Sequence, residues 1–175
     1  MQQLFHFNIV ASDFDRSYDF YTQVLGMKPL TSRSAGTSSS EPRADGHRPG
    51  EGKAAPGEAE HVADLLQMKG SGEYRGCFLY WGDNRGGPYI DLLQWDDVLP
   101  VVERNPQNAG LSRICIRVDD LDAELANLAK YNVPTLTEPK TFVLGVTTVR
   151  VATFKDPDGV MLEYLEFVAK KAWGE

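Results

Sequence analysis

The fold of this chain is decided by the sequence HFNIVASDFD, which stands at residues 6–15. The apolar run up to Ala11 predicts a strand, and Ser12 or Asp13 can then cap a helix. The same order of strand and capped helix recurs in RICIRVDDLD at residues 113–122. Two copies of one unit predict a duplicated protein, in which two similar halves can each supply part of the lining of one cavity.

Each half also contains, well downstream, an apolar strand with one carboxylate at its centre. The sequence YIDLL at 89–93 contains Asp91, and MLEYL at 161–165 contains Glu163. A buried carboxylate without a partner is costly, so both residues are candidates for a functional site. A shift of one residue in the strand register would instead turn both side chains outward.

The spacing of apolar residues after each cap is helical. In the first half the expected stripe is Phe14, Tyr18, Tyr21 and Leu25, with Gly26 as the stop. In the second half the expected stripe is Leu121, Leu125 and Leu128, with Asn132 near the corresponding stop. Further expected elements are a short helix at 61–68, a hairpin at 74–81 and 89–95, and strands near 133–137, 146–154 and 160–167.

These elements predict an α+β fold of two βαβββ modules that together form a half-open barrel. The first module is expected at 1–96 and the second at 111–168. A linker at 97–110 joins them, and a tail at 169–175 follows.

Residues 33–60 differ in composition from the rest of the chain. They contain no Val, Ile, Leu, Met, Phe, Trp or Tyr. Because such a segment can bury little apolar surface, it is interpreted as a mobile insertion in the first module. A lid over the cavity is the alternative interpretation.

Composition excludes several classes of partner. The net charge of −7 disfavours nucleic acids and anionic membrane surfaces. No apolar run is long enough to span a bilayer, and no secretory signal opens the chain, so a cytoplasmic location is expected. The two cysteines, Cys77 and Cys115, stand in apolar strands and are expected to be buried thiols.

The pattern resembles the vicinal oxygen chelate superfamily, which includes glyoxalase I, extradiol dioxygenases and bleomycin-binding proteins. The resemblance rests on residues 6–26, on VDDLD at 118–122, and on FKDPDG at 154–159 followed by Leu162 and Glu163. It covers nearly the whole chain except 33–60. It implies the two-module fold and a small-molecule ligand, and it leaves the reaction open because many chemistries share this fold.

In metal-using members, the first and last strand of each module each offer one ligand to a divalent ion. The resemblance places these positions on His6, Asp91, Arg113 and Glu163. Three of them suit Zn, Ni, Fe or Mn, but the Arg113 guanidinium has no lone pair for a metal. The resemblance therefore leaves two states open: a metal site of His6, Asp91 and Glu163, or a metal-free site in which Arg113 pairs with Glu163, Asp91 or both.

Three functions follow from these alternatives. The first is a glyoxalase-type enzyme, an isomerase or lyase that moves a proton on a small oxygenated organic molecule. Glu163 would be its general base, and Asp91 or Arg113 would stabilise the oxyanion. The second is a metal-free protein that sequesters an aromatic or antibiotic-like compound, and the third is an extradiol-type dioxygenase. A homodimer is a further open expectation, and we expect all four site positions to converge between the modules.

Overall fold

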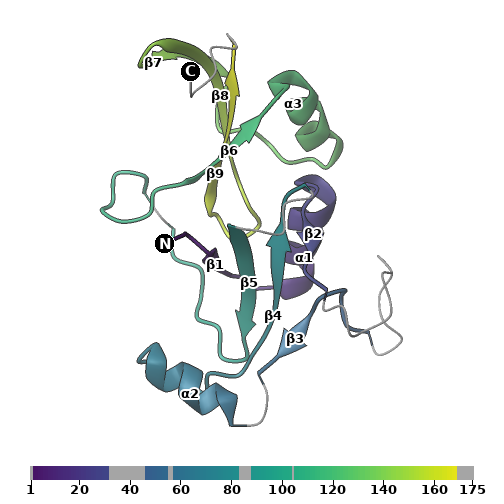
Figure 1. Ribbon diagram of the computed structural model, residues 1–175, viewed down its shortest axis with the longest axis vertical. Helices are drawn as coiled ribbons and strands as arrows, with labels where there is room; N and C mark the ends of the chain where they lie inside the picture. Colours follow the sequence, from purple (N-terminus) through teal and green to yellow (C-terminus); the bar gives the residue numbers. More distant parts are fainter. Residues whose placement is uncertain (1, 32–45, 55–56, 83–87, 104, 169–175) are drawn as a thin grey trace. The chain divides into compact units, whose positions relative to one another are not determined.

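The computed structural model describes residues 2–31, 46–54, 57–82, 88–103 and 105–168 (Figure 1). The chain divides into two compact units, Met1–Val101 and Val102–Glu175, and each is described here by itself. The boundary falls inside the segment 97–110 that was expected to link two modules. The expected tail, 169–175, lies outside the described residues.

The first unit is built on one mixed sheet. Its elements are β1 (His6–Val10), α1 (Phe14–Asp19), the π-helical turn η1 (Phe20–Val24), β2 (Lys28–Pro29), β3 (Gly52–Lys53), α2 (Glu58–Leu65), β4 (Tyr74–Tyr80) and β5 (Tyr89–Trp95). The strand order is β1-β5-β4-β2, and β3 also pairs with β4. Strand β1 runs parallel to β5, whereas β4 is antiparallel to each of its partners.

The second unit repeats this topology in shorter form. Its elements are β6 (Ile114–Val118), α3 (Leu121–Lys130), β7 (Lys140–Leu144), β8 (Thr147–Lys155) and β9 (Met161–Phe167). The strand order is β6-β9-β8-β7, with β6 parallel to β9. In both units the first strand therefore pairs with the last, which confirms the α+β class and the two βαβββ modules.

Helices α1 and α3 begin where the sequence indicates, and α1 continues as the π-helical turn η1 to Val24, just before Gly26. The Asp13 side chain accepts a hydrogen bond from the Arg16 amide at 3.0 Å, and Asp120 accepts one from the Ala123 amide at 3.0 Å. These caps satisfy amides that the first helical turn leaves without a partner. Asn132 has a φ of 57°, in the left-handed region expected at the end of α3. The stripe Phe14, Tyr18, Tyr21 and Leu25 is buried as expected.

The strand expected near 133–137 is wrong. Only an isolated bridge between Thr135 and Phe154 occurs there, and the strand of the hairpin is β7 instead. Every residue of β7 is exposed, so neither of its faces shows the alternation by which a half-buried strand is recognised. Pro134 further disfavours regular pairing, because proline has no amide hydrogen to donate.

The interpretation of 33–60 as a mobile insertion does not hold for residues 46–54. Their side chains reach back to the first unit through a network of ion pairs. The Glu51 carboxylate, whose side chain is 0% exposed, accepts hydrogen bonds from Arg75 at 2.9 and 3.0 Å. Arg48 donates to Asp15 at 2.8 Å and to Asp19 at 2.9 Å. Charged groups therefore anchor a segment that lacks large apolar residues.

Backbone contacts support the same anchor. The Tyr18 hydroxyl donates to the Pro49 carbonyl at 3.0 Å, and β3 pairs with β4. The insertion also extends into α2, which begins at Glu58 and ends at Leu65, three residues earlier than the helix expected at 61–68. Residues 33–45 and 55–56 of the predicted insertion lie outside the described residues.

No helix in the part of the chain that the structure describes is both long enough and apolar enough to cross a membrane.

We expect Glu51→Gln to destabilise the protein at pH 7 by roughly 2–3 kcal/mol, because it removes the partner of Arg75 in a largely buried pair. Burial raises the pKa of Glu51, but hydrogen bonds from Arg75, the Arg48 amide and His47 outweigh it and hold the pKa below its ordinary value of 4.5. The carboxylate therefore stabilises the fold above pH 4.5, and its contribution is lost as the pH falls through the lowered pKa. Urea unfolding at several pH values measures this.

The matched control for this variant is Glu138→Gln, since Glu138 is an exposed carboxylate in the second unit. It should leave the unfolding midpoint within error at every pH. An equally small effect of Glu51→Gln would show that the segment 46–54 is not anchored by this carboxylate.

Candidate functional site

The parallel pairing of β1 with β5 brings the first two candidate residues together. The register sets Asn8 opposite Asp91, with His6 two residues earlier on the same face of β1. The Asn8 amide donates to Asp91 Oδ2 at 2.8 Å, and His6 Nε2 lies 4.0 Å from the same oxygen. Three polar side chains from two strands thus form one cluster on the sheet.

The Asp91 carboxyl is the titratable group of this cluster that its surroundings perturb most clearly. Its side chain is 14% exposed. Burial raises its pKa above the ordinary value of 3.8, although the charge of His6 and the hydrogen bond from Asn8 act in the opposite direction. A carboxylate with a raised pKa is a stronger base than a solvated one, and it suits proton abstraction.

The equivalent pair in the second unit is already joined. Arg113 Nε donates to Glu163 Oε2 at 2.6 Å, which confirms the predicted pairing of Arg113 with Glu163. The Arg113 side chain is 49% exposed and that of Glu163 only 11%. The pair therefore lies at the edge of the sheet, with the carboxylate inside and part of the guanidinium in solvent.

Cys115 lies beside this pair, because it stands opposite Glu163 in the β6–β9 register. The expectation that Cys115 is buried is wrong: the residue is exposed, whereas Cys77 is buried as expected. Partial burial, the hydrogen bond to Glu163 and the charge of Glu163 raise the pKa of the Cys115 thiol to about 11. The thiol is therefore protonated at neutral pH and is a poor nucleophile.

A divalent metal is what the family resemblance implies at these four positions, and the residues of the second unit do not fit it. The Arg113 guanidinium occupies the Glu163 oxygen that a metal would need and brings a positive charge to that place. His6 and Asp91 supply only two donors within the first unit. Among the described residues, no three His, Cys, Asp or Glu side chains are grouped so that they could hold an ion.

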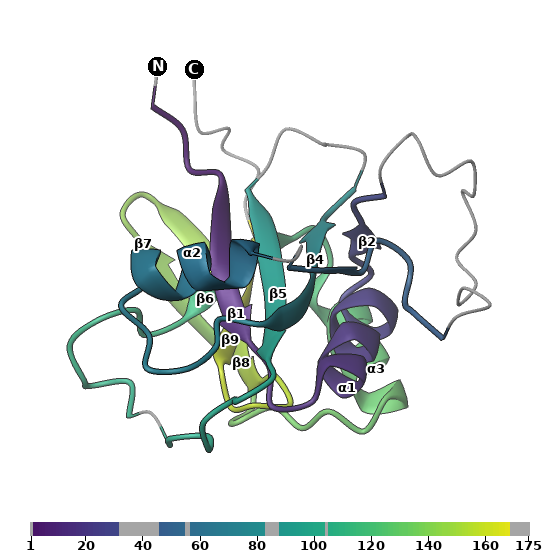
Figure 2. The same ribbon diagram turned by 90° about the horizontal axis from the view of Figure 1, so that it is seen from below.

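A groove of about 950 Å³ lies beside the His6 cluster in the first unit, and we call it the α2 groove. The sheet contributes His6, Asn8, Val10, Leu93 and Trp95 to its lining. The segment from α2 to Gly70 contributes Val62, Leu65, Leu66, Met68 and Lys69, and the loop after β5 contributes Asp97, Val98 and Leu99. Figure 2 shows α2 in front of β1 and β5, the two strands that line the groove.

The groove and α1 use different faces of the sheet. Gln94 accepts a hydrogen bond from the Phe14 amide at the start of α1, whereas its neighbours Leu93 and Trp95 line the groove. Successive side chains of a strand alternate between faces, so Asp91 shares the face of the groove. The groove therefore opens onto the face that carries His6, Asn8 and Asp91.

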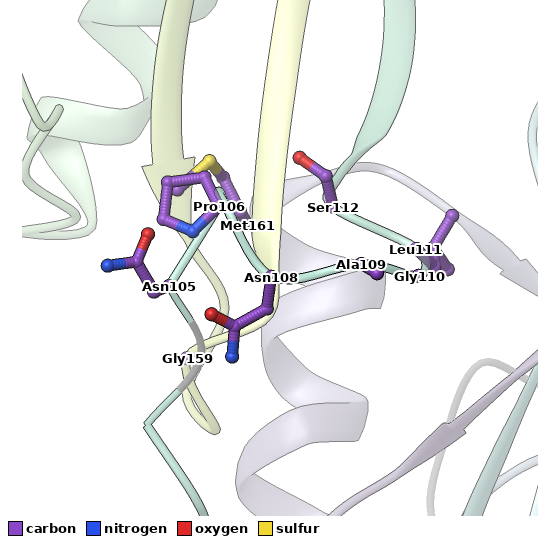
Figure 3. Close-up of a pocket in the computed structure, with 9 residues that line it drawn as sticks. All are labelled: Asn105, Pro106, Asn108, Ala109, Gly110, Leu111, Ser112, Gly159 and Met161. Atoms are coloured by element: carbon purple, nitrogen blue, oxygen red, sulfur yellow. The ribbon is translucent and has the colours of Figure 1, made fainter.

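A smaller hollow of about 240 Å³ lies in the second unit (Figure 3). Residues 105–112 supply most of its wall, with Gly159 and Met161. In Figure 3 the amides of Asn105 and Asn108 stand at this hollow. None of its lining residues titrates, so it offers no acid or base chemistry.

Sequence reasoning missed two parts of this arrangement. One is Asn8, which donates a hydrogen bond to the catalytic candidate Asp91. Asn8 stands two residues after His6, and this spacing indicates that Asn8 and His6 share one face of the strand. The α2 wall was missed because its apolar residues follow a segment without any. His61 is exposed on α2, whereas its neighbour Val62 lines the groove. That the His6–Asp91 and Arg113–Glu163 pairs share one site stays a prediction.

The sequence of this chain is similar to those of known proteins. The sequence profile of the Glyoxalase/Bleomycin resistance protein/Dioxygenase superfamily matches residues 3–164. A protein of Vibrio cholerae named probable lactoylglutathione lyase is 28% identical over 167 residues, which cover 94% of this chain and 90% of that protein.

Solved structures show the same fold. A glyoxalase family protein from Bacillus cereus superposes with a TM-score of 0.69 at 14% identity, covering 97% of this chain and 96% of that one. Glyoxalase I of Leishmania major superposes with a TM-score of 0.59 at 22% identity, covering 95% of this chain and 87% of that one. At these identities the likeness concerns the fold alone.

We expect Asp91→Asn to stabilise the protein at pH 7. A carboxyl whose pKa is raised on folding favours the folded state most when protonated, so ionisation at neutral pH costs stability that a neutral amide regains. A gain of about 1 kcal/mol would raise the melting temperature by roughly 2–4 °C. The difference should vanish below pH 3.8, where the wild-type carboxyl is protonated in both states. Calorimetry at pH 3 and pH 7 measures it, and a lower melting temperature at pH 7 would contradict the burial argument.

We expect Arg113→Met to destabilise the protein by roughly 1–2 kcal/mol. This is less than the roughly 3–5 kcal/mol typical of a fully buried pair, because the Arg113 side chain is 49% exposed and solvent screens its charge. Arg113→Lys keeps the charge and should recover part of the loss, which denaturant unfolding can measure. If Arg113→Met has no effect and Arg113→Lys matches it, the pair contributes nothing to stability.

Proposed function

Because this chain belongs to the Glyoxalase/Bleomycin resistance protein/Dioxygenase superfamily, we propose that it is an isomerase- or lyase-type enzyme that moves a proton on a small oxygenated organic molecule. The observation that carries the proposal is the Asp91 carboxyl: it is largely buried, bound by Asn8 and 4.0 Å from His6. The substrate would lie in the α2 groove, with its oxygen function toward this cluster.

The chemistry assigned to the cluster is proton abstraction beside a carbonyl group. Asp91 accepts the proton as the C–H bond breaks, and the electron pair moves into an enolate. The His6 ring, whose Nε2 lies 4.0 Å from the carboxylate, would donate an N–H hydrogen bond to the enolate oxygen. In an isomerase the substrate is an α-hydroxyketone, so the intermediate is an enediolate: Asp91 returns the proton to the former carbonyl carbon, the hydroxyl proton passes to the oxygen on that carbon, and the other C–O bond becomes the new carbonyl. In a lyase the enolate re-forms its carbonyl, and its electron pair expels a leaving group from the β-carbon.

Within this proposal, Asp91 replaces Glu163 as the expected general base. The Glu163 oxygen that would accept a proton is bound to Arg113 at 2.6 Å, whereas the groups that act on Asp91 within the described part of the first unit are the Asn8 amide and His6. Asn8 keeps the Asp91 carboxylate in place through a hydrogen bond that survives ionisation. Burial raises the pKa of Asp91 and so makes it a stronger base than a solvated aspartate.

A panel of α-hydroxyketones with alkyl and aryl tails tests the proposal. In deuterated water, proton NMR should show loss of the C–H signal beside the carbonyl in the presence of the protein. Asp91→Asn should slow this exchange by roughly 100-fold or more, the range for removal of a general base. Asp119→Asn, an exposed carboxyl in the second unit, is the matched control and should exchange like the wild type.

The pH profile of the exchange reports the same group. The rate should rise as the pH increases through the raised pKa of Asp91 and level off above it, because only the ionised carboxylate accepts a proton. Pre-treatment with EDTA should leave the rate unchanged, since Arg113 occupies the carboxylate that a metal would need. Loss of exchange on EDTA treatment, with recovery on addition of a divalent ion, would contradict this metal-free route.

A metal-free binding protein is the second candidate, and the Arg113–Glu163 pair favours it because the two groups neutralise one another without a substrate. Such a protein would bind apolar compounds tightly and would leave every ketone of the panel unchanged. The hemithioacetal of methylglyoxal and glutathione belongs in the same panel, as the substrate type that the name of the Vibrio cholerae relative suggests.

A further inference from the structure

Three leucines in the wall of the α2 groove are largely exposed to solvent. Leu65 is 80% exposed, Leu66 is 55% exposed and Leu99 is 82% exposed. Leu65 is the last residue of α2 and Leu66 is its C-cap, whereas Leu99 comes from the loop after β5, so separate parts of the chain direct apolar side chains at one hollow. Scattered exposed leucines are ordinary, but a concave cluster of them marks a binding surface.

His6 and Asn8, the polar residues that β1 contributes to the groove, lie toward one end of its sheet floor. His6 and Asn8 stand at the beginning and middle of β1, and Val10 ends it. Beyond Val10 the floor continues to Trp95 at the end of β5. Four residue steps along β1 span roughly 13 Å. The floor thus changes from polar to apolar along about the length of a ten-carbon chain.

The charges of the groove cancel. Its lining contains one lysine, Lys69, and one aspartate, Asp97, besides His6. Asp97 is already in use, because it accepts a hydrogen bond from the Ser71 amide at 3.3 Å and lies against Gly70. A ligand with several carboxylates would therefore find one lysine to balance them, and its remaining charges would lose water without gaining a partner.

We propose that the α2 groove selects an uncharged amphiphile: a molecule with an extended hydrocarbon or aromatic body and one carbonyl or hydroxyl group at its His6 end. This inference rests on the proposed function, for which it names the substrate class. The apolar body covers Leu65, Leu66 and Leu99, and the oxygen function lies beside His6 and Asn8. Hydrophilic peptide conjugates are excluded by the same lining.

A second copy of this chain is the competing occupant of such a surface. The volume of about 950 Å³ and the polar cluster in its floor favour a small molecule, because ligand pockets are concave and mostly apolar with few polar groups. A flat helix face without a floor would have favoured another protein.

Binding of the uncharged dye N-phenyl-1-naphthylamine to the full-length protein tests the proposal. The dye should bind with an increase in its fluorescence, and 1-decanol should displace it, whereas S-methylglutathione should not. Leu65→Asp should weaken dye binding by at least about tenfold, the loss expected when a buried leucine contact becomes a charge. Leu136→Asp is the matched control, an exposed leucine of the second unit that should bind the dye like the wild type.

Folding and location are checked in the same samples. Leu65 is exposed, so Leu65→Asp should keep the circular dichroism spectrum and melting temperature of the wild type. Leu66→Ser is a milder change in the same wall and should also weaken binding. Trp95→Phe should remove the decanol-induced change in tryptophan fluorescence that the wild type shows, because Trp95 lines the groove.

Three results would overturn the proposal: displacement of the dye by S-methylglutathione at lower concentration than by decanol, equal dye binding by wild type and Leu65→Asp, or a concentration-dependent dimer in sedimentation that Leu65→Asp abolishes. The last would identify the groove as an interface between copies.

Asp91→Asn separates this inference from the proposed function, because it should abolish proton exchange and keep dye binding. If the wild type binds decanol but exchanges no proton on any ketone of the panel, the proposed enzymatic function is wrong and the inference about the ligand class stands.

Discussion

The parallel pairing of the first strand with the last strand in each unit is the constraint on which the rest of the structure depends. It closes β1 on β5 and β6 on β9, although about eighty and fifty residues of chain separate the partners. That pairing converts four dispersed positions into two local pairs, His6 with Asp91 and Arg113 with Glu163. Helix caps, apolar stripes and the antiparallel strands then complete each module around its pairing.

The two pairs occupy equivalent positions and have opposite chemistry. In the first unit a neutral amide and a histidine surround a carboxyl whose pKa is raised by burial. In the second unit a guanidinium satisfies the carboxylate directly. A duplicated fold thus carries one pair available for proton transfer and one pair closed by its own cation, and a single residue, Arg113, produces the difference.

The segment 46–54 shows how a polar sequence can still be ordered. Its composition lacks the apolar residues by which burial is usually recognised, yet Glu51 is fully enclosed by Arg75, the Arg48 amide and His47. Ion pairs of this kind depend on partners far along the chain, such as Asp15 and Arg75, so the spacing of residues within the segment does not predict them. The same segment precedes α2 in the chain, so the ion pairs of Glu51 and Arg48 stand just before the helix that lines the α2 groove.

By itself, the sequence determined the elements whose signals are local: the capped helices, the αL position at Asn132, the duplicated strand-helix order and hence the two modules. The family resemblance placed a fixed cation, Arg113, beside the carboxylates Asp91 and Glu163, and left open which of them it pairs with. Only the tertiary structure decided the anchoring of Glu51, the placement of β7, the hydrogen bond from Asn8 to Asp91 and the α2 groove. These features arise from contacts between residues distant in the chain, whose strength depends on burial and geometry that composition and periodicity do not contain.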